Sequence, residues 1–297
     1  MRKVLGQVTE GKRFNFGKNW NRFLTILDEG RIQQAEKSLQ QMLEMGNLDG
    51  KLFLDIGSGS GLFSLAARRL GARVCSFDYD PLSVACTAEL KRRYFPNDYN
   101  WQIEEGNVLN RVFLESLGQF DIVYAWGVLH HTGAMWQASA NIVPLVRKGG
   151  KLFISIYNSQ GILSHYWAAL KKFYNQAPRP VRAVIILSVA ILLETRSSLY
   201  RLSQGQNPLP LKTWANKKKS RGMSVWHDLV DWVGGYPFEV AKPEEIFDFY
   251  RKNRFTLVKL KTCGGGLGCN EFVFVRENSG MPQESYSFEG CSNGNTC

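Results

Sequence analysis

The stretch that most constrains the fold is LDIGSGSGLFS, from Leu54 to Ser64. An apolar strand ends in an acid and an isoleucine, a turn with three glycines follows, and a helix begins directly after the turn. Gly57 and Gly59 can take positive φ, and they leave no Cβ in the way of a ligand close to the backbone. The helix start offers unpaired N–H groups. The stretch therefore predicts a ligand site at the carboxyl end of a strand in a parallel sheet.

The pattern on both sides of this turn predicts an α/β fold. From 50 to 158, five apolar segments with the character of strands alternate with four helical segments. This alternation is typical of a parallel sheet that helices cover on both faces. Two further strands, at 255–262 and 270–277, are separated by a short glycine-rich link, which predicts an antiparallel hairpin. Helical spacing from Trp20 to Met45 precedes the first strand.

The alternation stops at Gly161, and this interruption determines the domain organisation that we expect. The boundaries are 1–48 for an N-terminal helical cap, 49–160 for the core, 161–235 for an inserted basic lid with helices at 164–175 and 181–193, 236–278 for the rest of the core and 279–297 for a flexible tail. The first twenty residues lack the apolar run of a secretory signal and the six cysteines are scattered, so we expect reduced thiols in a cytoplasmic protein. The Cys-x5-Cys spacings near the end are wider than zinc sites use and have no histidine nearby, so we expect no metal.

The glycine turn differs from two common nucleotide-binding motifs. A dinucleotide fingerprint requires a small third residue where this chain has Leu62, and no Gly-Lys-Ser or Gly-Lys-Thr of a P-loop follows. Asp78 ends the second strand, seventeen residues after Gly61, where a carboxylate can accept both hydroxyls of a ribose. A ribose acceptor without a pyrophosphate cradle favours a nucleoside ligand.

Five motifs, taken in order, resemble those of class I S-adenosylmethionine-dependent methyltransferases. The motifs are FLDIGSGSG at 53–61, VCSFDYDP at 74–81, EGNVL at 105–109, FDIVYAWGVLHHTG at 120–133 and LVRKGGKLFISIYN at 145–158. The resemblance implies a Rossmann-like, seven-stranded sheet with an antiparallel last strand, and S-adenosyl-L-methionine as the cofactor.

The resemblance also implies roles for ten cofactor-binding residues. Asp55, Gly57, Ser58 and Gly59 would hold the amino-acid end of the cofactor, Asp78 the ribose, Tyr79, Asn107 and Val108 the adenine, and Trp126 and Gly127 the sulfonium end. Many relatives have aspartate at the position of Asn107, but an amide oxygen still accepts a hydrogen bond.

Two histidines are candidate catalytic bases in this interpretation. Methyl transfer from a sulfonium needs alignment and exclusion of water, and a hydroxyl acceptor also needs a base. Histidine suits that task because its ordinary pKa is near neutrality. His131, beside His130, follows the fourth strand, and His227 lies in an aromatic segment. The alternatives are loop packing and helix capping for His131, and a buried helix stripe for His227.

Aromatic residues near the N-terminus leave two interpretations open. Phe14, Phe16 and Trp20 either close over the cofactor, as N-terminal helices do in this family, or pack on the sheet. The sequence does not decide between them.

The inserted segment holds nearly all of the net charge of +11. From 161 to 222 there are eleven lysines and arginines and a single acid, Glu194. An apolar run from Ala183 to Leu193 has only eleven residues, whereas about 20 are needed to span a bilayer, so we expect no crossing. The open interpretations are a buried lid helix, a contact in a homodimer, and peripheral membrane contact through 181–221, with the Lys217–Lys219 run facing anionic head groups. Nucleic acid is a weaker candidate partner, because no RNA-binding module accompanies the basic segment.

Together these features predict an S-adenosylmethionine-dependent methyltransferase that acts on oxygen or nitrogen of a small-molecule or lipid- or glycan-type acceptor. The resemblance extends to quinone methylases of the ubiquinone pathway and to methyltransferases of surface-sugar biosynthesis. The alternatives are a peptide, protein or RNA acceptor, and a non-catalytic protein that binds S-adenosylmethionine.

Overall fold

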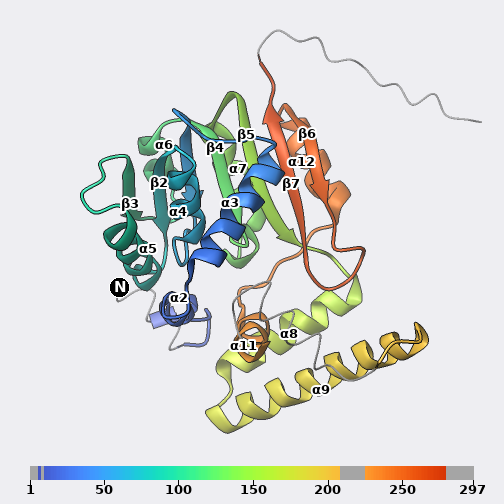
Figure 1. Ribbon diagram of the computed structural model, residues 1–297. Coiled ribbons are helices and arrows are strands. Elements are labelled where there is room, and N and C mark those ends of the chain that lie inside the picture. Colours follow the sequence, from blue (N-terminus) through green and yellow to red (C-terminus); the bar gives the residue numbers. More distant parts are fainter. Residues whose placement is uncertain (1–5, 8–9, 208–224, 279–297) are drawn as a thin grey trace, which may run out of the picture.

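A seven-stranded sheet forms the centre of the protein, with helices on both faces (Figure 1). The computed structural model describes residues 6–7, 10–207 and 225–278, without the side chains of 225–228 and 231. The strands are β1 (Leu52–Ile56), β2 (Arg73–Asp78), β3 (Trp101–Glu105), β4 (Phe120–Trp126), β5 (Val146–Tyr157), β6 (Phe255–Lys261) and β7 (Cys269–Arg276). Their order is β3-β2-β1-β4-β5-β7-β6; β1 to β5 run parallel, and β7 is antiparallel to both neighbours. This arrangement confirms the predicted parallel sheet with an antiparallel last strand.

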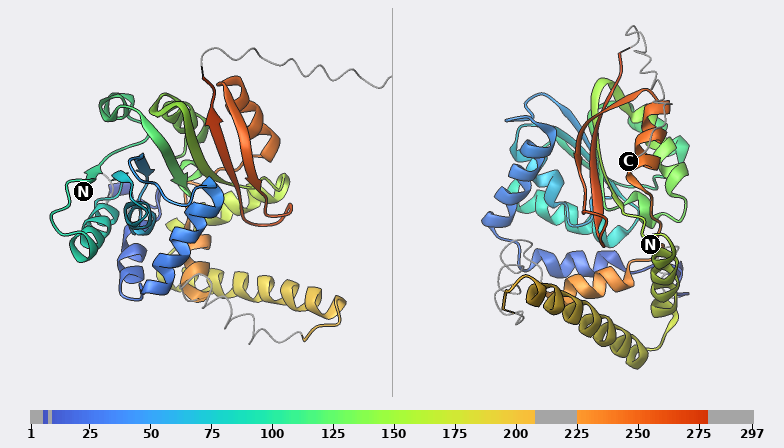
Figure 2. Two further views of the ribbon diagram at one scale, coloured as in Figure 1. Left: turned by 45° about the horizontal axis from the view of Figure 1, so that its top comes forward. Right: turned by 90° about the vertical axis from the view of Figure 1, so that its right-hand side faces the viewer.

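Two helical layers bury the two faces of the sheet, as Figure 2 shows. One layer consists of α3 (Glu29–Leu43), α4 (Leu62–Arg69) and α5 (Pro81–Tyr94), and the other of α6 (Arg111–Leu117), α7 (Met135–Ile142) and α12 (Pro243–Lys252). Successive side chains of a strand point to opposite faces, so Phe53 packs in the core below the first layer and Leu54 in the core below the second. Both faces are covered, which explains why the central strands are apolar at nearly every position.

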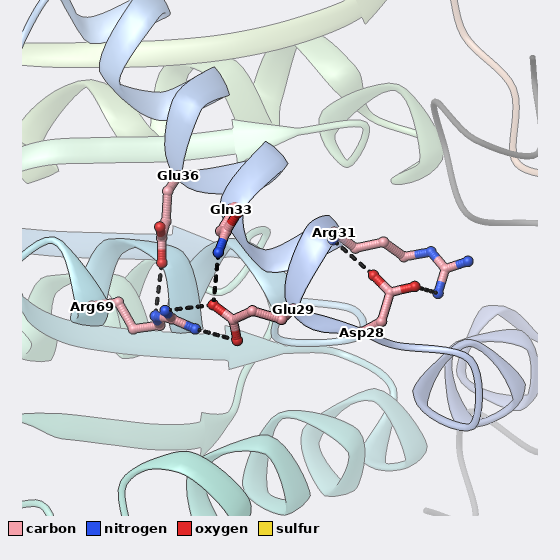
Figure 3. Close-up of polar contacts among 6 residues, drawn as sticks. All are labelled: Asp28, Glu29, Arg31, Gln33, Glu36 and Arg69. Atoms are coloured by element: carbon pink, nitrogen blue, oxygen red, sulfur yellow. Dashed lines mark hydrogen bonds and ion pairs between the residues drawn. The ribbon is translucent and has the colours of Figure 1, made fainter.

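Between residues 16 and 43 the structure has two helices, whereas the sequence predicted one stretch from Trp20 to Met45. The first helix, α2 (Phe16–Leu24), ends before Asp28, whose side chain caps α3 by accepting a hydrogen bond from the Arg31 N–H at 2.9 Å. Figure 3 shows how α3 is then held to α4, because Arg69 forms ion pairs with Glu29 and Glu36 at 2.7 and 2.8 Å. The break at Asp28 allows α3 to lie on the sheet while α2 crosses the ends of the strands (Figure 1).

The described part of the insert contributes the helices α8 (Ile162–Gln176), α9 (Arg179–Ser203) and α11 (Val225–Gly234) at the carboxyl ends of the strands. They share a small apolar cluster around Tyr174, Ile186, Val189 and Val233. The helix α9 has 25 residues and extends far beyond the predicted 181–193. By length and composition alone it could cross a membrane, which the eleven-residue apolar run did not predict. Residues 208–224, including Lys217–Lys219, lie outside the described part of the chain.

Candidate active site

A cavity lies where the carboxyl ends of β1, β2 and β4 meet the N-terminal segment. In the strand order, β1 lies between β2 and β4. The chain adds β2 and β3 on one side of β1 and then crosses to the other side to add β4 and β5. Parallel α/β sheets bind ligands at such a switch point. The cavity therefore lies where the glycine turn predicted a ligand site.

Glycine is required at both positions of the turn that line the cavity. The φ angles of Gly57 and Gly59 are 70° and 56°, in the left-handed region. A Cβ on Gly57 would lie 2.6 Å from the side chain of Val128, and one on Gly59 would lie 3.0 Å from the ring of Trp20. The Gly57 N–H donates to the carbonyl of Phe77 at 2.8 Å, which holds the turn against the end of β2. The backbone is thus fixed close to any ligand in the cavity.

Asp78 presents its carboxylate to the cavity from the end of β2. One oxygen accepts a hydrogen bond from the Gly59 N–H at 2.9 Å, and the other accepts one from the Asp80 N–H at 2.8 Å. Burial raises the pKa of Asp78 to about 6. A carboxylate has about four sites for donors, so two remain for the hydroxyls of a ribose.

The wall next to Asp78 suits a heteroaromatic base. Phe77, Val108 and Leu109 supply apolar surface, and Asn107 supplies an amide. The Asn107 side-chain oxygen accepts a hydrogen bond from the Leu109 N–H at 2.9 Å, which fixes the side chain in the loop after β3.

Two residues of the N-terminal segment, Arg13 and Gln7, also line the cavity. No motif in the sequence predicted that they belong to the site. The guanidinium of Arg13 lies 4.8 Å from the centre of the Tyr79 ring, close enough for a cation–π contact. Its pKa is lowered by burial, and the charges of Asp78 and Asp80 oppose that shift. Gln7 also lines the cavity and accepts a hydrogen bond from the Tyr79 hydroxyl at 3.3 Å.

The helix α2 forms the cover of the cavity. Phe16 and Trp20 line it, while Phe14 contacts Phe16 at 5.1 Å between ring centres and packs in the cluster of the insert. The Gly17 N–H donates to Asp80 at 2.9 Å, which holds the helix to the start of α5. Phe16 and Trp20 therefore line the cavity, and Trp20 also packs against the core on one face of the sheet. Phe14 packs with the insert, which neither interpretation included.

Two predicted cofactor residues lie behind the turn. Asp55 is buried and accepts a hydrogen bond from the Ser64 hydroxyl, and burial raises the pKa of Asp55 to about 7. Ser58 pairs with the hydroxyl of Thr87 at 2.9 Å. Neither residue is part of the cavity wall, where the structure brings together Gly57, Gly59, Asp78, Tyr79, Asn107, Val108, Trp126, Gly127 and His131.

His131 is the candidate base that reaches the cavity. Its Nδ1 lies 2.6 Å from the carbonyl oxygen of Pro237, and because a carbonyl only accepts, Nδ1 carries the proton and Nε2 is left as an acceptor. Burial lowers the pKa of His131 to about 3. The neighbouring His130 is also buried, and its pKa is lowered too. His227 belongs to α11, but its side chain lies outside the described residues.

Residues 54–152 match the family model described as a methyltransferase domain. Over these residues the chain carries a methyltransferase domain. This match covers the cavity residues from the glycine turn to His131, and domains of this family use S-adenosylmethionine as the methyl donor.

Curated relatives match part of this methyltransferase. A ribosomal protein L11 methyltransferase from Prochlorococcus marinus (strain AS9601) is 37% identical over 160 residues, which cover 53% of this chain and 47% of the relative. A ubiquinone biosynthesis O-methyltransferase from Escherichia fergusonii is 30% identical over 118 residues, which cover 39% of this chain and 47% of the relative. The chain spans about half the length of the curated relatives it matches.

A solved structure with the same fold is the magnesium protoporphyrin IX methyltransferase from Synechocystis PCC 6803, crystallised with S-adenosylhomocysteine. Its TM-score is 0.51 at 15% identity, and the match covers 88% of this chain and 94% of that one. An O-methyltransferase family protein from Burkholderia thailandensis has a TM-score of 0.50 at 13% identity, covering 84% of this chain and 57% of that one. These likenesses confirm the class I methyltransferase fold.

Proposed function

We propose that this methyltransferase transfers the methyl group of S-adenosylmethionine to an oxygen or nitrogen of a small-molecule or lipid- or glycan-type acceptor. The observation that supports the proposal is one cavity that contains a glycine turn, a ribose-binding carboxylate and a histidine with a free acceptor nitrogen. The ubiquinone biosynthesis relative, whose name indicates O-methylation, supports this class of acceptor.

The residues of the cavity fit S-adenosylmethionine, which when bound supplies a methyl group activated by a sulfonium for in-line displacement. Asp78 accepts the ribose hydroxyls, and the turn at Gly57 and Gly59 allows the ligand to approach the backbone. Phe16 and Trp20 exclude water above the turn. Alignment of two reactants in such an enclosed site is the main contribution that a protein makes to this kind of transfer.

His131 orients the acceptor in this proposal. Its Nε2 accepts a hydrogen bond from an acceptor hydroxyl, while the carbonyl of Pro237 holds the ring. A group with a pKa of about 3 removes a proton poorly at neutral pH, since an efficient base has a pKa near the working pH. Positioning is the role that this geometry supports, and the methylated acceptor releases its proton to solvent after the transfer.

A protein acceptor is the second candidate, because the ribosomal protein L11 methyltransferase shares 37% identity with the matched region. The test uses methyl-labelled S-adenosylmethionine, the full chain and a lysate of the native organism, with Asp78→Ala as the control without cofactor binding. Label in the lipid extract or in soluble small molecules supports the proposal. Label in protein or RNA contradicts the proposed acceptor class and identifies a macromolecular acceptor instead. Calorimetric binding of S-adenosylhomocysteine without label anywhere contradicts methyl transfer and leaves a non-catalytic binding protein.

A further inference from the structure

The helix α9 presents an apolar face to solvent over nearly its whole length. We call this face the α9 outer face, and it consists of Val181, Val184, Leu187, Ser188, Ile191, Leu192, Thr195, Leu199 and Leu202, all of them exposed. Most of these residues follow one another at intervals of three or four, so they form a single stripe along the helix. The stripe contains no charged residue, and Leu199 is still 62% exposed.

The opposite face of α9 is bound to the rest of the insert. Ile186 and Val189 are buried against Tyr174 of α8 and Val233 of α11. The contacts with α8 and α11 therefore determine which side of α9 faces outward. At 1.5 Å per residue the α9 outer face is about 30 Å long, and Figures 1 and 2 show α9 at the edge of the molecule, remote from the sheet. An exposed apolar patch of this size marks an interaction surface.

Exposed cationic side chains lie on α9 itself and on the neighbouring helix α8. Lys172 on α8 and Arg179 and Arg196 on α9 are exposed. The only acid between 161 and 207 is Glu194, and it forms an ion pair with Arg201 at 2.7 Å. An apolar helix face on a segment with an excess of cations is complementary to a bilayer surface that carries anionic head groups.

We propose that α9 lies in the plane of an anionic membrane surface, with the α9 outer face among the upper acyl chains and the cations near lipid phosphates. A helix that crosses the bilayer would have to release Ile186 and Val189 from the insert and bury Arg182 and Arg196 in hydrocarbon, which is costly. A symmetric contact between two copies would bring the excess positive charge of the two inserts together. This surface does not depend on methyl transfer.

Contact of α9 with a membrane would also determine how an acceptor reaches the cavity, an inference that rests on the proposed function. The insert and the cavity lie at the same end of the sheet, so membrane contact brings the methyl-transfer site close to the bilayer (Figure 1). An acceptor that is dissolved in the membrane, such as a long-chain lipid with a polar head, then reaches the cavity without crossing water.

The test measures binding of the full chain to sedimented vesicles of phosphatidylcholine, with and without phosphatidylglycerol. We expect binding to the anionic vesicles to be at least about tenfold tighter than binding to neutral ones. Ile191→Gln/Leu199→Gln removes apolar surface from the α9 outer face and is expected to weaken anionic binding by about tenfold or more. The control is Tyr99→Gln/Val112→Gln, which changes two apolar residues that are even more exposed, near β3 and α6 and away from α9, and is expected to bind like the wild type.

A second variant, Lys172→Gln/Arg179→Gln/Arg196→Gln, is expected to weaken anionic binding by about tenfold or more without changing the weak binding to neutral vesicles. Thermal unfolding and S-adenosylhomocysteine binding, measured on every variant, show that the fold and the cofactor site are intact and separate failure of this proposal from failure of the proposed function. Equal binding of wild type and both variants would overturn the proposal. So would a dimer in solution that Ile191→Gln/Leu199→Gln dissociates without any vesicle binding by the wild type. If bound protein resists extraction by both high salt and alkali, the result would contradict a helix in the membrane plane and indicate that α9 spans the bilayer.

Discussion

At the scale of single residues, the cavity depends on how Asp78 is held. Backbone N–H groups of Gly59 and Asp80 fix both of its oxygens, so the carboxylate is already oriented before a ligand arrives. Preorganised groups of this kind contribute more to affinity than mobile ones, because less conformational entropy is lost on binding. Asp78 also has a pKa raised to about 6, so its charge changes within an accessible pH range.

Asp78→Asn is expected to weaken binding of S-adenosylhomocysteine by about tenfold to a hundredfold, because hydrogen bonds to a charged group contribute about 1.5–3 kcal/mol. Ribose hydroxyls donate to the ionised carboxylate, so wild-type affinity is expected to fall as the pH drops through about 6. Titration calorimetry from pH 5 to pH 8 measures both effects. Asp248→Asn, on the exposed surface of α12, is the control. Unchanged affinity in Asp78→Asn would contradict the assignment of the ribose site.

His131→Ala is expected to lower kcat by about tenfold to a hundredfold on the acceptor found by labelling, with S-adenosylhomocysteine affinity within about twofold of wild type. His131→Gln, which keeps an acceptor in the side chain, should recover part of the loss. Because the pKa of His131 is about 3, the ring stays neutral above pH 5, and wild-type kcat should show no inflection from this group between pH 5 and pH 8. An inflection near pH 6 to 7 that disappears in His131→Ala would make His131 a general base instead of a positioning residue.

At the scale of elements, a close backbone approach at Gly17 helps to hold the helix α2 to the core. Gly17 donates to Asp80, and a Cβ at this position would lie 2.5 Å from the Cβ of Leu82. No larger residue fits there unless the helix moves. The two aromatic residues that cover the cavity, Phe16 and Trp20, are therefore positioned by their small neighbour.

Gly17→Ala is expected to shift α2 and to weaken S-adenosylhomocysteine binding by about tenfold, and it should also lower the melting temperature. Gly30→Ala in α3 is the matched control, because its Cβ would meet only an Asp28 oxygen at 3.4 Å. There the gain in helix propensity should stabilise the fold by up to about 1 kcal/mol. Calorimetry and thermal unfolding distinguish the two glycines, and effects of the same sign in both variants would count against the docking role of Gly17.

At the scale of the whole molecule, Lys171 links the insert to the core. It is fully buried on α8, donates to the carbonyl of Trp232 in α11, and lies 4.8 Å from the ring centre of Phe238 and 6.0 Å from that of Tyr157 on β5. The pKa of Lys171 is lowered to about 7, and burial is the cause. A single ammonium group on α8 therefore interacts with α11 of the insert and with two segments of the core.

The unfolded chain binds a proton at Lys171 up to about pH 10, whereas the folded chain loses it near pH 7. The free energy of unfolding should therefore rise with pH between 7 and 10, by up to about 1 kcal/mol per pH unit from this group. Lys171→Met removes that contribution, so it should be more stable than wild type at pH 7, with the difference shrinking toward pH 10. Urea unfolding of both proteins measures this, with the exposed Lys172→Met as control. A stability difference that does not change with pH would contradict the lowered pKa.

Much of the domain was predictable from short stretches of sequence. Strand and helix periodicity from 50 to 158, together with the acid at 78 and the glycines at 57 and 59, predicted the parallel sheet, the switch-point cavity and a nucleoside ligand. The cofactor S-adenosylmethionine was implied by the resemblance of five motifs to a known family. These features are predictable because each follows from a short stretch of sequence, in which neighbouring residues determine the secondary structure and the turn. The class of acceptor stays a prediction, since no local pattern of this chain specifies it.

Other features were decided only by the tertiary structure, because they depend on contacts between distant residues. Arg13 reaches the cavity from a segment more than sixty residues away from Asp78, and Asp55 lies behind the turn because its side chain is held by Ser64. The same holds for α9, where the sequence showed an apolar run but not which side of the helix would be buried. That side was determined by packing against Tyr174 and Val233, which left the α9 outer face exposed.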